Sequence, residues 1–118
     1  MVISPYSSLR IPYGERIINY LGPVMRYAES GELNSDGRID TPAFHRNHKF
    51  VVEVLDQHLN TATGDVLELG SGSGQHVIGF AKALPNLTFW PSDLESEQVQ
   101  SINAWRQESA CTNIESAF

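Results

Sequence analysis

Three glycines at alternate positions, Gly70, Gly72 and Gly74, constrain this chain more than any other feature of its sequence. A short apolar run broken by one acid, residues 66–69, precedes them, and a helical pattern follows at once. A strand, a glycine turn and a helix in this order present backbone N–H groups to a nucleotide-like ligand in α/β domains. We expect Gly70 to adopt unusual backbone angles, Gly72 to leave the backbone accessible, and Gly74 to let the helix pack close to the strand.

Apolar periodicity predicts a helix ahead of the glycines, beginning near Thr41. Thr41 is a suitable cap and Pro42 suits the first turn. The spacing places five residues on one apolar face: Phe50, Val51, Val54, Leu55 and Leu59. A polar turn then leads into the strand over residues 66–69.

The pattern after the glycines repeats the alternation of helix and strand. A second helix ends at Pro85, and residues 87–90 form a second strand rich in aromatic and β-branched residues. A third helix follows, capped by Ser92 together with Glu95 or by Ser96 alone, and residues 113–118 begin another strand. The order helix, strand, helix, strand, helix predicts an α/β fold with parallel strands covered by helices.

Length and composition limit the classes of protein to be considered. The chain has 118 residues, enough for one domain, and a net charge of −6 without a basic segment, which disfavours a nucleic-acid surface. No apolar run is long enough to span a membrane, the N-terminus lacks a signal peptide, and Cys111 is the single cysteine. We therefore expect a cytoplasmic protein without a membrane partner. Residues 1–40 are broken by glycine and proline, and form either an arm or lid over the site or a poorly ordered leader.

The acid at position 93 and the spacing of the glycines limit the class of ligand that the loop could bind. Asp93 ends the second strand 19 positions after Gly74 (93 − 74), where an acid is the expected ribose ligand. The glycines read GxGxG, and Gln75 stands where a dinucleotide-binding GxGxxG loop has its third glycine. Glu68, just inside the strand end, would repel a pyrophosphate and attract an ammonium group.

At these residues the sequence resembles the class I S-adenosylmethionine-dependent methyltransferases. Their first motif is an apolar strand, an acid, one apolar residue and GxGxG, which residues 66–74 match, and Asp93 matches the acid closing the second strand. Within that superfamily the chain looks like a small family of uncharacterised methyltransferase-like proteins over about residues 40–118. Three blocks carry this closer resemblance: Thr41-Pro42-Ala43-Phe44-His45-Arg46-Asn47, Gly72-Ser73-Gly74-Gln75-His76 and Leu87-Thr88-Phe89-Trp90-Pro91-Ser92-Asp93-Leu94.

The resemblance implies S-adenosyl-L-methionine as cofactor and methyl transfer to a small molecule or protein. It assigns the methionine end of the cofactor to the glycine loop: Gly70, Ser71, Gly72 and Gly74. It places Glu68 near the ammonium, Asp93 on the ribose hydroxyls and Leu94 against the adenine. Arg46 either faces the methionine carboxylate or is a solvated helix charge. Glu68 has the alternative of capping backbone N–H groups, and Asp93 that of capping the third helix.

The resemblance is to only part of the family fold, which has seven strands. We therefore expect a partial Rossmann-like methyltransferase fold, the N-terminal part of such an enzyme, with an unpaired edge on the first strand that favours self-association. The catalytic residues and methyl acceptor are not identified. A catalytically inactive remnant and a nicotinamide-dependent reductase remain alternatives. The four histidines do not form a zinc pattern, and His76 is either a packing residue or a base near the substrate.

Overall fold

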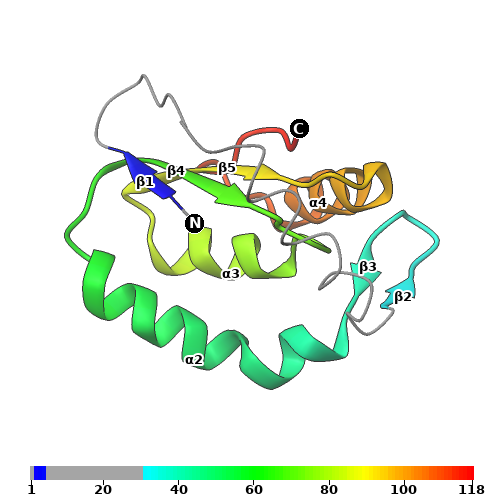
Figure 1. Ribbon diagram of the computed structural model, residues 1–118, viewed down its shortest axis with the longest axis horizontal. Coiled ribbons are helices and arrows are strands. Elements are labelled where there is room, and N and C mark those ends of the chain that lie inside the picture. The colour runs from blue at the N-terminus through cyan, green and yellow to red at the C-terminus, as the bar shows by residue number, and fades with distance from the viewer. Residues whose placement is uncertain (1, 5–30) are drawn as a thin grey trace.

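The computed structural model describes residues 2–4 and 31–118 of the chain (Figure 1). Most of the arm, lid or leader predicted over residues 1–40 lies outside the described residues. The described helices and strands are, in order, β1 (Val2–Ser4), β2 (Glu32–Leu33), β3 (Ile39–Asp40), α2 (Pro42–Leu59), β4 (Gly64–Leu69), α3 (Gln75–Ala83), β5 (Leu87–Ser92) and α4 (Ser96–Ser109).

The main sheet has the order β1-β4-β5, and its central pair is parallel. β4 and β5 pair in register from Gly64 opposite Leu87 to Leu69 opposite Ser92. The chain after α4 then runs beside β5, where the Phe89 N–H donates to the Asn113 carbonyl at 2.9 Å and Phe89 and Ile114 form a parallel bridge. The predicted mixed α/β fold with parallel strands is confirmed, whereas the further strand expected over residues 113–118 is represented only by the isolated bridge at Ile114.

The opposite edge of β4 differs from the sequence prediction. β1 pairs there in antiparallel fashion, with Val2 opposite Leu67 and Ser4 opposite Asp65 (Figure 1). The prediction of an unpaired edge beside the first parallel strand is therefore wrong over these residues. A three-residue strand followed by proline is too short to produce a periodic signal, so the sequence did not reveal it.

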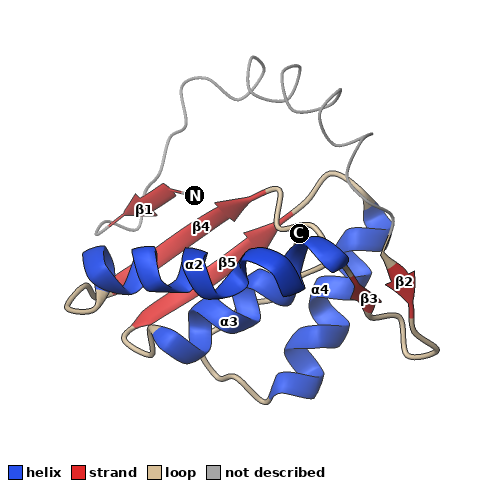
Figure 2. Ribbon diagram, turned by 90° about the horizontal axis from the view of Figure 1, so that it is seen from below, coloured by secondary structure: helices blue, strands red, loops and turns tan. Residues whose placement is uncertain are grey.

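The core lies between the sheet and α3, with α4 closing one end. Figures 1 and 2 show α3 between the sheet and α2, so α2 forms an outer layer. The buried apolar residues come from both strands, α3, α4 and the final segment: Val66, Val77, Ile78, Phe80, Ala81, Leu84, Leu87, Phe89, Ile102 and Ile114. In the described parts of the chain, no helix is long and apolar enough to cross a membrane.

The predicted apolar face of α2 is only partly correct. Val51 and Leu55 pack against the core, but Phe50 and Val54 are 70% and 53% exposed, and Val52 packs inward instead. As an outer-layer helix, α2 partly buries one narrow stripe of residues and leaves the adjoining stripe in solvent.

The predicted start of this helix is confirmed, but the capping bond expected from Thr41 is not formed among the described residues. α2 begins with Pro42 in its first turn, and Thr41 occupies the N-cap position without a side-chain capping bond among the described residues. The Thr41 hydroxyl donates instead to Gln75 on α3. This bond connects the beginning of α2 to the beginning of α3.

Candidate functional site

The glycine loop connects the carboxyl end of β4 to α3, and all three of its glycines have positive φ. The angles are +69° at Gly70, +57° at Gly72 and +91° at Gly74, a region that L side chains rarely adopt. No described atom lies within 4 Å of a Cβ built on Gly70 or Gly72. Backbone conformation therefore requires these two glycines, and the space that their side chains would fill is open to a ligand.

Gly74 is also required because another helix packs against it, and the expectation that α3 and β4 make this close contact is wrong. A Cβ on Gly74 would lie 2.6 Å from the Ile102 Cα, an impossible approach. The close contact is thus between the loop and the backbone of α4, rather than between α3 and β4. Gly74 lets α4 lie directly against the loop.

Asp93 follows β5 and is hydrogen-bonded to the tip of the glycine loop. Its Oδ2 accepts from the Gly72 N–H at 2.9 Å, and its Oδ1 accepts from the Glu95 N–H at 3.1 Å. Glu95 is the N-cap residue of α4 and makes no side-chain capping bond in the described structure, so the predicted caps at Ser92 and Ser96 are wrong. Asp93 therefore links loop and helix, and the adjacent Leu94 is 65% exposed.

Glu68 is a buried acid at the base of the same loop. The residue is only 8% exposed, and its Oε2 has no hydrogen-bond partner among the described residues. Burial is the main influence on this carboxyl and raises its pKa above the ordinary 4.5; the Ser71 side chain partly offsets the rise, and the nearby charge of Asp93 adds a smaller increase. Oε2 does not cap a backbone N–H, so this oxygen lacks the partner that the expected capping role would give it.

Ser71 and Ser92 fix the backbone around Glu68. The Ser71 N–H donates to the Ser92 carbonyl at 2.9 Å, and the Ser92 N–H donates back to the Ser71 Oγ at 3.1 Å. The Ser92 hydroxyl also donates to the Glu68 carbonyl at 2.8 Å. These bonds close the end of the β4–β5 pair, which holds the predicted residues Glu68, Ser71 and Gly72 beside Asp93.

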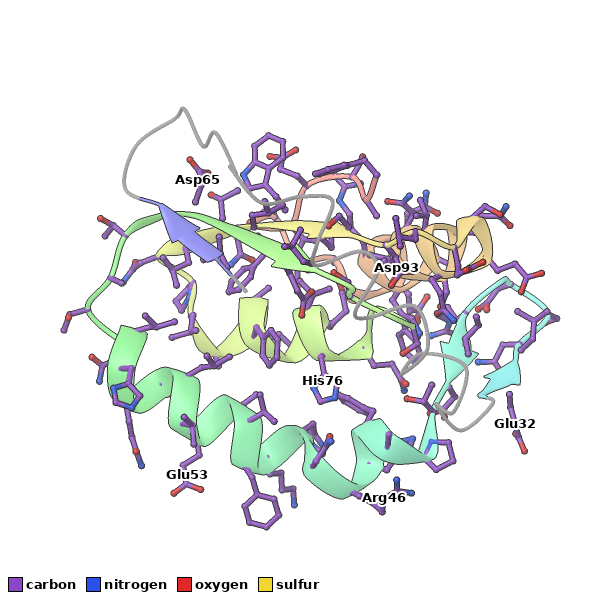
Figure 3. The ribbon with its side chains drawn as sticks, in the orientation of Figure 1. Glu32, Arg46, Glu53, Asp65, His76 and Asp93 are labelled. Carbon is purple, nitrogen blue, oxygen red and sulfur yellow. The ribbon has the colours of Figure 1, made fainter. Side chains whose placement is uncertain are left out.

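Arg46 is not brought to the loop with the other predicted residues. It is exposed, and Figure 3 shows it on the side of α2 that faces away from α3 and the sheet. Its two predicted roles, the cofactor contact and the helix charge, stay predictions.

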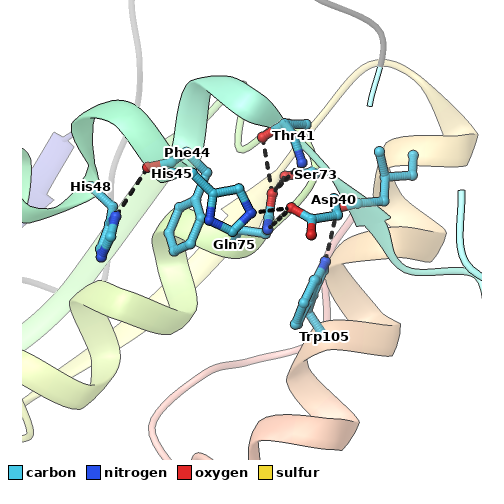
Figure 4. Close-up of polar contacts among 9 residues, drawn as sticks. Asp40, Thr41, Phe44, His45, His48, Ser73, Gln75 and Trp105 are labelled. Atoms are coloured by element: carbon cyan, nitrogen blue, oxygen red, sulfur yellow. Dashed lines mark hydrogen bonds and ion pairs between the residues drawn. The ribbon is translucent and has the colours of Figure 1, made fainter. Parts of the chain in front are cut away.

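Gln75, noted in the sequence only as a missing glycine, is the centre of a hydrogen-bond cluster (Figure 4). Its Oε1 accepts from the Thr41 N–H at 2.8 Å, the Thr41 hydroxyl at 2.9 Å and the Ser73 hydroxyl at 3.1 Å. Its Nε2 donates to Asp40 Oδ1 at 2.8 Å, and His45 Nε2 lies 2.6 Å from the same oxygen. The glycine loop, α3 and the start of α2 thus meet at a side chain that is 4% exposed.

Ser101 on α4 connects the same segments from the other side and was also missed. It is fully buried, accepts from the Ile39 N–H at 2.8 Å and donates to the Ser73 carbonyl at 2.7 Å. Trp105 donates to the Ile39 carbonyl at 3.0 Å. The available signal was the position of Ser101 beside the apolar residues of this helix, which indicates a buried polar side chain but not its distant partners.

The histidines near the loop have structural surroundings. His76 is half-buried, with its ring 5.2 Å from that of Phe44 and 5.7 Å from that of Phe80. Burial lowers the pKa of His76, as does the nearby His48. Figure 3 shows His76 between α2 and α3, which supports its packing role. Over residues 2–4 and 31–118, no group of three or more His, Cys, Asp or Glu side chains is placed to hold a metal ion.

A comparison with protein families covers this whole site. The profile of the family described as "Protein of unknown function (DUF938)" matches residues 38–118. The chain belongs to this family. The DUF938 match spans every element from β3 to α4, and therefore includes the glycine loop, Asp93 and the cluster around Gln75.

Proposed function

We propose that this DUF938 chain is the cofactor-binding part of an S-adenosylmethionine-dependent methyltransferase, built on a partial Rossmann-like fold. The observation that carries the proposal is Glu68, a buried carboxyl with one oxygen unpartnered beneath an open glycine loop. Burying an acid in this way is costly unless a partner compensates for it. The α-ammonium group of S-adenosylmethionine is such a partner, so the residues present fit the cofactor.

The surrounding residues would hold the rest of the cofactor. Gly70 and Gly72 give its methionine end access to the backbone, since no described atom fills the space beside them. Each carboxylate oxygen of Asp93 accepts one hydrogen bond from the backbone and has a further lone pair, which suits two ribose hydroxyls. The exposed Leu94 side chain offers an apolar surface for the adenine.

Bound at this site, the cofactor supplies an electrophilic methyl group on a sulfonium, and the chain's own residues bind and orient it. Such a transfer depends mainly on the alignment of the acceptor with the methyl group. The acceptor in the proposal is a small molecule or a protein. The same buried acid argues against a nicotinamide dinucleotide, because an ionised Glu68 beside the loop would repel a pyrophosphate.

Calorimetric titration of the 118-residue chain with S-adenosylhomocysteine and, separately, with NAD⁺ tests the proposal. We expect saturable 1:1 binding of S-adenosylhomocysteine and none of NAD⁺. Asp93→Ala should abolish or strongly weaken the binding, whereas Glu97→Ala, which removes an exposed acid on α4, should preserve it. No binding of S-adenosylhomocysteine by the folded chain, or equal binding by both variants, would contradict the proposed site.

A further inference from the structure

We propose that Gln75 is a positioning residue that sets the glycine loop for its ligand and couples the loop to residues 39–41. The inference rests on the proposed function for the identity of the ligand. It goes beyond it by assigning a role to a side chain that the cofactor need not touch. Gln75 joins three segments: the loop, the start of α3 and the entry to α2.

The orientation of the Gln75 amide is fixed by its neighbours. The Thr41 N–H can only donate, so the Gln75 oxygen must face it. The amide nitrogen then faces Asp40, whose carboxylate oxygen accepts its proton. Hydrogen bonds from Gln75 and His45 both lower the pKa of Asp40, which keeps this acceptor ionised. With four hydrogen bonds and 4% exposure, the side chain has a single arrangement that satisfies all its partners.

Ser73, between Gly72 and Gly74, is held from both sides. Its hydroxyl donates to Gln75, and its carbonyl accepts from the buried Ser101 hydroxyl. The flanking glycines leave the backbone unusually free, so these side chains supply the order that the loop sequence does not. A loop fixed before binding loses less conformational entropy when the ligand arrives, and so binds it more tightly.

The same bonds make the site and the entry to α2 respond together. Ile39 and Thr41 donate their backbone N–H groups to Ser101 and Gln75, the two residues that hold Ser73. A ligand that stabilises the loop must therefore also stabilise residues 39–41, because coupling between two sites is reciprocal. This coupling appears as slower exchange of the Thr41 amide hydrogen in the presence of ligand.

Gln75→Met, which keeps the length of the side chain and removes its amide, tests the inference against Asn113→Leu. Asn113 is a matched control because its amide donates to the carbonyls of Ala81, Leu84 and Leu87, at the other end of α3. For Gln75→Met we expect about a tenfold rise in the Kd of S-adenosylhomocysteine, equivalent to about 1.4 kcal/mol. Asn113→Leu should lower the unfolding temperature comparably and leave the Kd within about twofold of wild type.

The Kd of Gln75→Met, compared with that of the similarly destabilised Asn113→Leu, is the reading that a purely structural role would not change, and hydrogen exchange at Thr41 reports the coupling itself. In the wild type and in Asn113→Leu, S-adenosylhomocysteine should slow exchange at Thr41, and in Gln75→Met at saturating ligand it should not. Binding by Gln75→Met with wild-type affinity, or retained protection of Thr41 in that variant, would overturn the inference while leaving the proposed function intact. Failure of the wild type to bind would instead contradict the proposed function.

A milder variant keeps the inference testable if Gln75→Met does not fold. Thr41→Val removes one of the three hydrogen bonds accepted by the Gln75 oxygen and keeps the backbone bond. We expect about a threefold rise in Kd, since one lost hydrogen bond is worth roughly half of the larger effect. An unchanged Kd would count against the role of the Gln75 cluster.

Discussion

The substitution Glu68→Gln should make the free protein more stable while weakening its binding of cofactor. Glu68 is 8% exposed with Oε2 unpartnered among the described residues, so folding either buries its charge or keeps it protonated. Burial raises its folded-state pKa above the ordinary 4.5. An acid with a raised folded-state pKa favours folding below its unfolded pKa, and that advantage is lost as pH rises through the folded value.

The size of the effect follows from this linkage. Keeping an acid of pKa 4.5 protonated costs about 1.4 kcal/mol per pH unit above that value, which sets an upper limit of about 3.5 kcal/mol at pH 7. Glutamine does not ionise, so Glu68→Gln avoids this cost. We expect Glu68→Gln to raise the free energy of unfolding by about 1–3 kcal/mol at pH 7, or roughly 4–12 °C in unfolding temperature.

Thermal unfolding at pH 7 and pH 4, with and without S-adenosylhomocysteine, measures both halves of the prediction. The gain in stability should be present at pH 7 and absent at pH 4, and the ligand should stabilise the variant less than the wild type. Glu97→Gln is the control, because Glu97 is exposed and should give no gain at either pH. A variant less stable than wild type at pH 7, or a gain independent of pH, would refute this reading of Glu68.

Three further predictions concern the loop and its neighbours. Gly74→Ala should lower the free energy of unfolding by about 2–5 kcal/mol, because it combines a φ of +91° with a Cβ 2.6 Å from the Ile102 Cα. Gly37→Ala, with a φ of +87° and open space around its Cβ, should lower it by only about 1–2 kcal/mol, as measured by denaturant unfolding. Gly72→Ala should lose about 1–2 kcal/mol and bind S-adenosylhomocysteine at least roughly tenfold more weakly, because the new methyl group fills the open space beside the loop; calorimetry showing wild-type affinity would place the ligand elsewhere. Hydrogen bonds from Gln75 and, to a lesser extent, from His45 lower the pKa of Asp40. The stability that its ionised carboxylate contributes is therefore present above pH 3.8, its ordinary pKa, and is lost as the pH falls through the lowered pKa of the folded state. Asp40→Asn should therefore lose less than about 1 kcal/mol at pH 7, given the half-exposed side chain, and the difference should shrink in acid unfolding curves.

Local sequence patterns were sufficient for the centre of the fold. The strand, glycine loop and helix around Gly70 were predicted because their signals, apolar periodicity and alternate glycines, are contained in a few consecutive residues. The position of Asp93 directly after β5 was predicted for the same reason, since its spacing from the loop follows from the size of one helix and one strand. Its hydrogen bond to the Gly72 N–H could not be read from that spacing.

The contacts that were missed join residues far apart in the chain. Gln75 and Thr41 are separated by 34 positions, and Ser101 and Ile39 by 62. Their hydrogen bonds depend on how α3 and α4 pack against the rest of the fold, and the periodicity of apolar residues within one segment does not reveal that packing. The same limitation explains Gly74, whose neighbour Ile102 is on another helix, and β1, whose partner Val66 lies more than 60 residues away.

The central claim, that the glycine loop binds S-adenosylmethionine, is tested most directly by following backbone amide resonances during a titration with S-adenosylhomocysteine. The account predicts saturable shifts concentrated at Gly70, Gly72 and Asp93, with a smaller response at Thr41 and none at Asn113, which lies at the other end of α3. Unchanged loop resonances at saturating ligand, or shifts centred away from the loop, would contradict it.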